Sequence, residues 1–299
     1  MASYNTELTR EGPGLLVRDL GRGAKDIEFV LTRMAEVDAD LWVLQNFDFD
    51  LDGVALSRFA AAAGYAHSFA QAPNGGRQSG VDLDGDGRLG GRDDSQGFGW
   101  FSGQGGMAVL SRYPVTLRGD ETARLWADIP WATLPETMDA EARAVQRLSS
   151  TAHWALRVDF PGGPLTVLTA HATPPVFDGP EDRNGLRNAD EIRLVAEMLE
   201  ATAGPVVIAA NLNVDPARGE GRRAVIAELL AHPRLRDPLP GAVTVDFGAE
   251  SGGRLRVTYV LPTRDLGLSG AGIFRYGSRP EGFTRHDPVW IDIKLPVGE

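Results

Sequence analysis

Apolar runs and amphipathic stretches alternate along the chain, an arrangement typical of a mixed α/β protein. Apolar residues recur every three to four positions in four stretches, which predicts helices at residues 26–37, 52–63, 186–201 and 221–231. Shorter continuous apolar runs predict buried strands at residues 41–44, 106–110, 165–170, 206–210, 256–261 and 289–295. Helices that fall between many strands favour two sheets packed face to face, with the helices outside.

Individual residues add detail to the first two helices. Asp26 stands where the first helix begins and is expected to cap it. In the second helix, Leu56, Phe59 and Ala60 share one face and are expected to point inward. The chain shows neither a repeat of about 20 to 50 residues nor a long linker, so we expect one domain over residues 1–299.

Residues 71–105 are the most glycine-rich part of the chain and are predicted to form one large surface excursion. Within this insertion, the sequence from residue 82 to residue 93 reads DLDGDGRLGGRD. Acids at its first, third and fifth positions converge on one point, a glycine at the sixth allows a sharp turn, and the seventh carbonyl adds an oxygen. This spacing predicts a structural Ca²⁺ site with the ligands Asp82, Asp84, Asp86, Arg88 and Asp93.

Two positions of this loop carry further expectations. The twelfth position holds Asp93 in place of the usual glutamate, and Asp94 is a second candidate. Leu89, at the eighth position, is expected to anchor the loop. Residues 82–94 carry five acids against two arginines, a net charge of −3 that opposes an ordered loop without a cation. The alternative is an acidic, glycine-rich loop that is simply solvated.

Composition limits the classes of function. The chain has 299 residues, no cysteine and a net charge of −11. Without cysteine there are no disulfides, thiolate metal sites or cysteine nucleophiles, and the acidic balance argues against nucleic-acid binding. No apolar stretch reaches the roughly 18 residues of a transmembrane helix. The first residues lack the features of an export signal, so we expect a cytoplasmic protein or the mature form of an exported one.

Polar residues gather at the ends of four apolar runs, in residues 42–48, 168–171, 208–216 and 284–290. Strand ends are where a two-sheet scaffold presents a site. Read together, these segments resemble the endonuclease/exonuclease/phosphatase superfamily, which includes DNase-I-like nucleases and phosphoinositide phosphatases.

The resemblance runs from about residue 4 to residue 296 and includes a bacterial, phosphoesterase-like branch of the superfamily. The segments that match this branch are residues 4–6, 12–20, 82–87, 97–112 and 171–193. The resemblance implies a four-layer α/β/β/α sandwich, in which two mixed, mainly antiparallel sheets pack face to face beneath outer helices.

The resemblance also implies a catalytic pocket, and there the sequence departs from active members. Their magnesium-binding glutamate and the aspartates of the GDxN, DYVLP and SDH motifs are replaced, in that order, by Asn46, Asn211, Thr258 and Arg285. The other pocket residues match the family: Asn5, His171, Asn213 and His286. A misalignment is an alternative at Thr258, since the residues that flank the other three replacements match.

These replacements change the chemistry that the pocket can perform. An amide or a hydroxyl holds Mg²⁺ far more weakly than a carboxylate does, and Asn211 cannot take a proton from water. Arg285 is a permanent cation that disfavours the protonated form of His286. We therefore expect a catalytically degenerate member, retained for binding or as a structural subunit of an assembly, in which Mg²⁺ binding is doubtful. The alternative is an active metal-dependent phosphoesterase or nuclease with a rearranged site.

The charge of the pocket suggests a ligand. The four acids of the family sum to −4, which two Mg²⁺ ions cancel, whereas the same four positions here carry +1 from Arg285. The hypothesis is that the pocket holds phosphate or another anion without metal, through Arg285, the two pocket histidines and the asparagines. A protein partner is also expected if the chain belongs to an assembly, but the sequence does not identify one.

The remaining histidines are interpreted as structural. His67 is expected to be packed or hydrogen-bonded in a strand, and His153 and His232 are expected at surface or edge positions. Residues 182–184 fit two roles equally, a place beside the pocket or a set of local hydrogen bonds that hold the loop after His171.

Overall fold

The structure is a computed structural model that describes residues 1–275 and 279–295. Its helices are α1 (Leu15–Arg22), α2 (Lys25–Val37), α3 (Val54–Ala63), α4 (Ala140–Val145), α5 (Arg183–Glu200) and α6 (Arg223–Leu230). Its strands are β1 (Ala2–Asn5), β2 (Leu41–Gln45), β3 (His67–Phe69), β4 (Met107–Ser111), β5 (Val115–Asp120), β6 (His153–Phe160), β7 (Gly163–Ala170), β8 (Val206–Asn211), β9 (Val245–Asp246), β10 (Arg254–Leu255), β11 (Thr258–Pro262), β12 (Gly267–Ile273) and β13 (Val289–Lys294).

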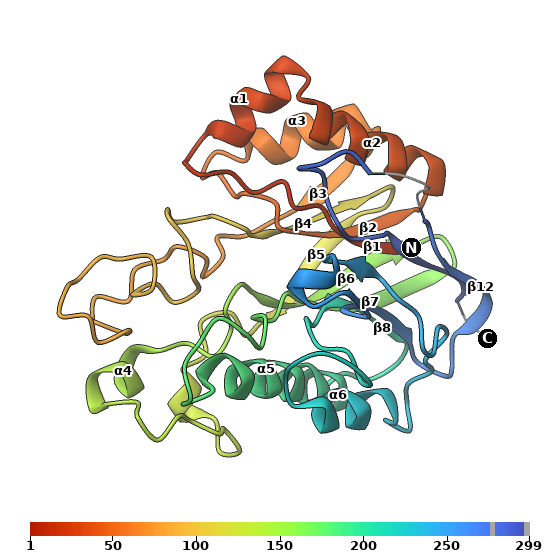
Figure 1. The fold of residues 1–299 in the computed structure, drawn as a ribbon. Coiled ribbons are helices and arrows are strands. Elements are labelled where there is room, and N and C mark those ends of the chain that lie inside the picture. The colour runs from red at the N-terminus through yellow and green to blue at the C-terminus, as the bar shows by residue number, and fades with distance from the viewer. Residues whose placement is uncertain (276–278, 296–299) are drawn as a thin grey trace.

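Two large sheets form the centre of the molecule (Figure 1). One has the strand order β12-β13-β1-β2-β4-β3, and the other has the order β11-β8-β7-β6-β5. The pairs β1–β2 and β7–β8 are parallel, and the other pairs in these two sheets are antiparallel. Helices α1, α2 and α3 cover the first sheet, and α5 and α6 cover the second. The predicted α/β/β/α sandwich of two mixed sheets is confirmed.

A single strand can serve two hydrophobic cores. In β2, Leu41 and Val43 face the other sheet, whereas Trp42 and Leu44 face the helices of the first layer. A third core lies between the second sheet and α5 and α6. Because both faces of the inner strands are covered, strands such as β2 and β8 are apolar at nearly every position, which explains why continuous apolar runs predicted them.

Strand register brings distant segments to one end of the sandwich. The parallel strands β1 and β2 both end there, at Asn5 and Gln45. The parallel strands β7 and β8 continue toward the same end, where His171 forms a bridge with Asn211. Strand β11 is antiparallel to β8 and begins opposite Asn211, at Thr258. Polar residues from both sheets therefore meet at this end.

The sequence predicts most of the large elements and misses others, among them the inner strands β1 and β6. Helices α2, α3, α5 and α6 and strands β2, β4, β7, β8, β11 and β13 match the predicted segments to within a few residues. The sequence pattern did not predict β5 or β12, which are edge strands with half-exposed or exposed side chains and hence no apolar run. Among the described residues, no helix is both long and apolar enough to cross a membrane.

Two expectations about local structure are corrected. Helix α2 starts at Lys25, and Asp26 lies inside its first turn, where it accepts a 2.7 Å hydrogen bond from Arg10 instead of capping the helix. The stretch 71–105 is not one continuous surface excursion, because residues 73–76 and 94–97 are buried. Asn74 in the first of these segments donates to the carbonyls of Thr122 and Ser149, each at 2.7 Å, so this segment is an integral part of the fold.

Candidate functional site

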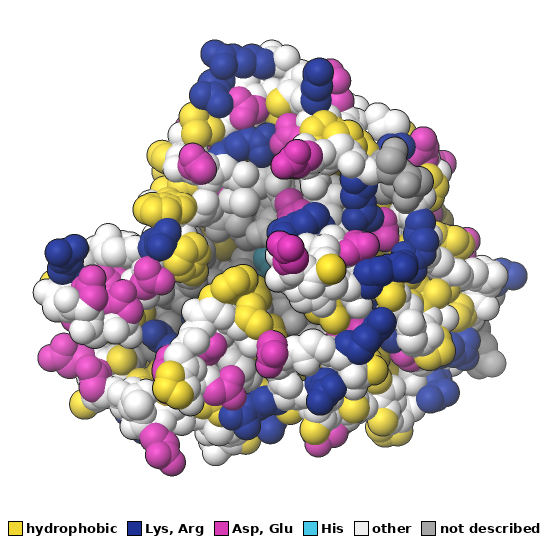
Figure 2. Space-filling view, viewed as in Figure 1, with side chains coloured by type: hydrophobic (Ala, Val, Ile, Leu, Met, Phe, Trp, Pro, Cys, Tyr) yellow, Lys and Arg dark blue, Asp and Glu magenta, His cyan; other side chains and the backbone are white. Residues whose placement is uncertain are grey.

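The structure gathers the predicted pocket residues at the polar end of the sandwich. Each lies at a strand end or in the segment next to one: Asn5, Asn46, His171, Asn211, Asn213, Thr258, Arg285 and His286. On this face the surface is hollowed, and a histidine is visible at the floor of the hollow (Figure 2). Direct hydrogen bonds join several of these side chains, and Thr284, next to Arg285, donates to the carbonyl of Asn5, 279 positions away.

Asn46 and Asn5 form an amide pair. Nδ2 of Asn46 donates to Oδ1 of Asn5 at 2.9 Å, and the Asn46 backbone is left-handed (φ 54°), which asparagine tolerates. Gly105 lies against this pair, since a Cβ added there would be 3.2 Å from Oδ1 of Asn46. Two carboxylate or carbonyl oxygens at such a distance would need a proton or a cation between them, whereas an amide supplies its own hydrogen. The two side chains therefore stabilise each other through this hydrogen bond and do not require a metal ion between them.

A second group of neutral side chains lies on the other sheet. Asn211 donates to Asn213 Oδ1 at 3.0 Å and accepts a 3.3 Å hydrogen bond from Thr258. Asn213 in turn donates to the carbonyl of Ala172 at 2.7 Å. Asn211 and Thr258 are fully or almost fully buried. Each amide thus has a protein partner, and the group carries no charge that would attract a cation.

Arg285 does not face the pocket as a free cation. Its Nε and Nη2 lie 3.0 and 2.5 Å from Glu7 Oε1, its backbone N–H donates to Glu7 Oε2 at 2.6 Å, and its guanidinium lies 4.9 Å from the Phe247 ring centre. Burial alone would raise the pKa of Glu7, but the hydrogen bonds from Arg285 hold it below its ordinary value. The +1 counted from the sequence is therefore cancelled by a carboxylate 278 positions away.

The two pocket histidines are buried and neutral at pH 7. Burial lowers the pKa of His171 to about 4, and a hydrogen bond that the ring donates to the backbone of Gly105 opposes this shift. Burial also lowers the pKa of His286 to about 4, and Arg285 adds to this effect while Glu7 opposes it. The Nδ1 atoms of both histidines are buried and have no hydrogen-bond partner among the residues that the structure describes. Each ring can offer one lone pair to a ligand, but neither carries a positive charge for an anion.

Sequence reasoning missed three residues that shape the pocket: Glu7, Gly105 and Phe247. Phe247 packs edge-on against His286, with ring centres 5.7 Å apart, and lies under Arg285. Glu7 had one available signal, because it stands two residues after Asn5 and its backbone N–H donates to Asn5 Oδ1 at 3.3 Å. Gly105 lies in the matched segment 97–112, whereas Phe247 had no signal, since it reaches the pocket only through tertiary packing.

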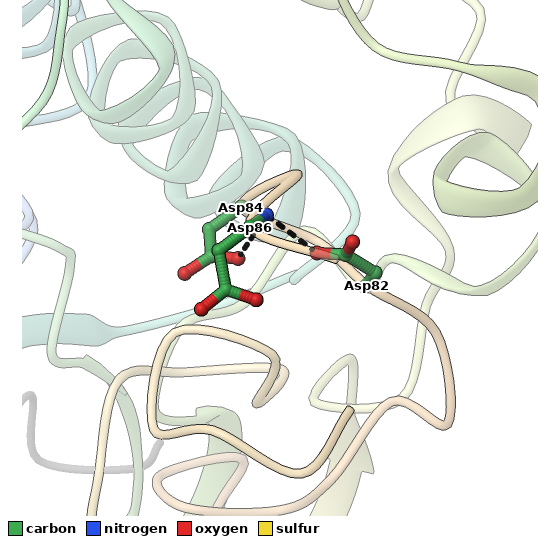
Figure 3. A group of neighbouring side chains, drawn as sticks. All are labelled: Asp82, Asp84 and Asp86. Carbon is green, nitrogen blue, oxygen red and sulfur yellow. Dashed lines mark hydrogen bonds between the residues drawn. The ribbon is translucent and has the colours of Figure 1, made fainter. Parts of the chain in front are cut away.

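The predicted calcium loop brings three carboxylates together. Oxygens of Asp82, Asp84 and Asp86 all lie within 4.8 Å of one another (Figure 3). The backbone N–H of Asp86 lies 3.2 Å from an oxygen of Asp82 and 3.2 Å from one of Asp84. Oxygens that share one Ca²⁺ at about 2.4 Å must lie within roughly this separation, so the three side chains fit such an ion.

The other loop residues behave differently. Asp93 is not in this group and lies 3.4 Å from Arg92, whereas Asp94 is buried and accepts hydrogen bonds from the backbone of Leu83 and Gly91. Asp94 therefore closes the neck of the loop. Leu89 is 70% exposed, so the expectation that it anchors the loop is wrong.

The segment 182–184 holds loops in place. Arg183 donates to the carbonyl of Leu83 at 2.9 Å, which ties α5 to the acidic loop, and Asn184 donates to the carbonyl of Val176 at 2.8 Å. Of the two roles left open by the sequence, these contacts favour the structural one. Arg183 therefore links the calcium-loop candidate to the helix below it.

The expectation of a surface position for His153 is wrong. His153 is fully buried on β6, with Nδ1 2.8 Å from Ser149 Oγ and Nε2 3.1 Å from the carbonyl of Glu191. Burial lowers its pKa to about 4. His67 lies at β3, half-exposed, and His232 is half-buried beside Glu200.

Comparison with known proteins identifies the family of this chain. A model of the endonuclease/exonuclease/phosphatase family matches residues 2–284, and the chain therefore belongs to this family. A search of curated proteins gave no match. Similarity to solved structures is confined to the fold, because the identities are 18% or lower in the examples that follow.

Three of these structures cover nearly the whole chain. An endonuclease/exonuclease/phosphatase from Beutenbergia cavernae is 18% identical with a TM-score of 0.61, over 98% of this chain and 70% of that one. Sphingomyelinase C from Streptomyces griseocarneus is 18% identical with a TM-score of 0.55, over 96% of each chain. A mannosyl-6-phosphatase from Bacteroides thetaiotaomicron is 16% identical with a TM-score of 0.53, over 98% of each chain.

Proposed function

We propose that this chain is a catalytically degenerate member of its family, retained for binding or as a structural subunit of an assembly. The observation that carries the proposal is the hydrogen-bonded amide pair of Asn5 and Asn46 at the position of the family's magnesium ligand. A hard cation at this position would have to break that hydrogen bond and would gain neutral oxygens in place of a carboxylate.

The rest of the pocket supports the same function. Asn211, in the position of the water-activating aspartate, already donates to Asn213 and cannot accept a proton. Arg285, in the position of a carboxylate, is paired with Glu7. Each change alone removes one group that takes part in metal-assisted hydrolysis. Together they remove the negative charge that would bind the metal ions.

Hydrolysis assays test this function. Bis(4-nitrophenyl) phosphate and supercoiled plasmid DNA are offered to the purified chain with Mg²⁺, Mn²⁺ or Ca²⁺. We expect the same background rate for the wild type and for His171→Ala, because no reaction depends on the pocket. In an active enzyme, loss of a pocket histidine costs about 100-fold or more in rate.

His232→Ala serves as the matched control, since it removes a half-buried histidine that lies beside Glu200 on the outer helical layer. Metal-dependent turnover that disappears in His171→Ala but persists in His232→Ala would overturn the proposal. A contaminating hydrolase would respond to neither substitution.

Glu7 supports the second candidate, an active phosphoesterase with a rearranged metal site. Its carboxylate lies near His286, and its backbone is bonded to Asn5. Release from Arg285 would free this carboxylate for a metal ion. We rank this function second because the present hydrogen bonds commit both Glu7 oxygens to Arg285.

If the degenerate pocket still binds a ligand, we expect that ligand to be an anion such as phosphate. Phosphate would have to displace Glu7 to reach the guanidinium of Arg285, so the available donors are the remaining amide N–H groups, and the neutral histidine rings offer lone pairs to a protonated phosphate oxygen. This set favours a weakly held, partly neutral phosphate ester over a free dianion. The proposed ligand class is therefore an esterified phosphate bound without metal.

We propose in addition that residues 82–93 hold a structural Ca²⁺ ion. Asp82, Asp84 and Asp86 would supply carboxylate oxygens, and the carbonyl of Arg88 and a carboxylate of Asp93 would complete the set after Asp93 leaves Arg92. The ion would offset the −3 of this segment and stiffen a loop that closes through Asp94.

Calcium is expected to raise the thermal stability of the chain. At a hundred times its dissociation constant, one bound ion adds about 2.7 kcal/mol, a shift of several degrees in a melting curve. The double variant Asp84→Asn/Asp86→Asn should lose both this shift and the heat of binding in calorimetry. Asp159→Asn on β6, whose exposed carboxylate pairs with Arg157, is the control and should keep them. A wild-type melting curve that is identical in Ca²⁺ and in EDTA would contradict the site.

A further inference from the structure

The large hydrophobic side chains that remain exposed are few and are concentrated. Among the described residues they are 61% to 92% exposed, and all lie in loops: Leu51, Leu89, Phe98, Trp100 and Phe177. Leaving such side chains in water is unfavourable, by about 25 cal/mol for each Å² of apolar surface. Single exposed apolar residues are ordinary, but their restriction to a few neighbouring loops is not.

These loops all belong to the polar end of the sandwich. Leu51 follows Asn46 by five residues, and Phe177 follows His171 by six. The stretch 71–105 leaves after β3 and returns to β4 through Gly105, beside Asn46. The exposed hydrophobic side chains thus stand on three loops that leave the polar end of the sandwich, and Figure 2 shows hydrophobic groups on both sides of the hollow. We call these five side chains the rim.

The rim has a connected centre. Phe98 and Phe177, from different loops, line one groove of about 990 Å³. The guanidinium of Arg92 lies 4.5 Å from the ring centre of Trp100 and 5.1 Å from that of Phe98. A cation held over aromatic rings at a polar–apolar boundary can contact a phosphate while the rings contact hydrocarbon.

We propose that this rim, residues Leu51, Leu89, Phe98, Trp100 and Phe177, docks on a zwitterionic phospholipid surface. The apolar side chains are separate from one another and lie on three loops. Each can insert individually into a lipid interface, because that interface is deformable. A protein partner would instead need a contiguous, complementary surface of about 800 Å².

The negative charge near the rim favours zwitterionic over anionic lipids. The segment 82–94 that carries Leu89 has a net charge of −3, and further acids, including Asp178 and Glu181, line the groove. An anionic membrane would be repelled by this side of the rim, whereas phosphatidylcholine has no net charge. Arg92 can approach its phosphate. The inference holds whether or not the pocket catalyses a reaction.

Vesicle binding tests the proposal. The full chain is sedimented with phosphatidylcholine vesicles in EDTA, and quenching of tryptophan emission by brominated phosphatidylcholine is followed in parallel. We expect binding to fall about tenfold or more in Phe177→Ser and again in Phe177→Ser/Trp100→Ser. Most of the quenching should be lost in Trp100→Phe, because Trp100 is 61% exposed, whereas Trp131 and Trp290 are only half-exposed and the other three tryptophans are fully buried.

The control is Arg264→Ser, which removes an exposed side chain in the turn after β11, away from the β11 terminus that lies in the pocket. It should bind vesicles like the wild type. The substituted rim residues are exposed, so circular dichroism and melting curves should stay unchanged. Absence of vesicle binding, equal binding by Phe177→Ser, stronger binding to phosphatidylserine in EDTA, or a dimer that Phe177→Ser dissociates would each overturn the proposal.

Discussion

At pH 5 the protein is expected to unfold at a clearly lower urea concentration than at pH 7. Burial lowers the pKa values of His153, His171 and His286 to about 4 in the folded chain. In the unfolded chain a histidine titrates near 6.5. Between pH 6.5 and pH 4 the unfolded state therefore binds more protons than the folded state, and the free energy of unfolding decreases as the pH is lowered. The stabilising contribution is complete above about pH 6.5 and is lost progressively toward pH 4.

The size of this effect is about 2 kcal/mol for each histidine at pH 5. Burial raises the pKa values of Asp48, Glu191 and Asp287, and these carboxyl groups titrate with the opposite sign and offset part of the loss. The carboxyl groups are the same in the wild type and in a histidine variant, so their contribution cancels when the pH slopes of the two proteins are compared. Urea unfolding at pH 7, 6 and 5 should show a smaller pH slope in His153→Gln than in the wild type.

The control for this measurement is His67→Gln, which changes a half-exposed histidine on the edge strand β3. Its slope should equal that of the wild type even if its absolute stability differs. Equal slopes for His153→Gln and the wild type would show that His153 binds its proton equally in both states, contrary to its burial.

The second large effect is expected from Glu191, a fully buried carboxylate on α5. Its Oε1 accepts hydrogen bonds from Ser150 N–H at 2.6 Å and Ser150 Oγ at 2.7 Å, and its Oε2 accepts one from Thr173 N–H at 2.6 Å. Burial raises the pKa of Glu191, and the buried cation Arg187, one helical turn away, opposes this rise. The carboxylate therefore fastens the two loops that flank His171.

Arg187 completes this buried network. It donates to the carbonyls of Leu148, Gln96, Arg147 and Ser149, and burial lowers its pKa to about 10. Glu191 and Arg187 are buried opposite charges without a direct ion pair, and removal of one leaves the other buried without its neighbouring counter-charge. For a buried ion pair such a removal costs about 3 to 5 kcal/mol. We therefore expect Glu191→Gln to lower the free energy of unfolding by about this amount.

Glu197→Gln, on the same helix, is the matched control, since its carboxylate is 40% exposed and pairs with Arg124 at the surface. It should cost about 1 kcal/mol or less. Because Glu191→Leu/Arg187→Met removes both charges, the double variant should be more stable than the sum of its single changes predicts. Additive losses in chemical denaturation would mean that Glu191 and Arg187 do not interact.

The sequence predicts the fold to the extent that local patterns reflect burial. The inner strand β2 is covered on both faces and is apolar at four of its five positions, so a short window reveals it. The edge strand β5 alternates half-exposed and exposed residues, and a short window cannot distinguish it from a loop. Asp26 shows the same limit, because whether it caps α2 depends on Arg10, which reaches it from outside the helix.

The candidate site divides in the same way. The identities of Asn46, Asn211, Thr258 and Arg285 follow from motif positions, and no fold can turn an amide into a carboxylate. The chain therefore determines by itself that four expected acids are absent. Its Gly/Asp spacing likewise predicts the convergence of Asp82, Asp84 and Asp86.

Only the tertiary structure decided the charge and exposure around these residues. It paired Arg285 with Glu7, buried His153, and left Leu89 in solvent at a position where the loop pattern predicted an anchor. The physical reason is the distance along the chain over which each effect acts. Periodicity and turn chemistry act over a few residues, whereas the pairing of charges and the burial of a side chain depend on strand register and layer packing, which join residues as far apart as 7 and 285.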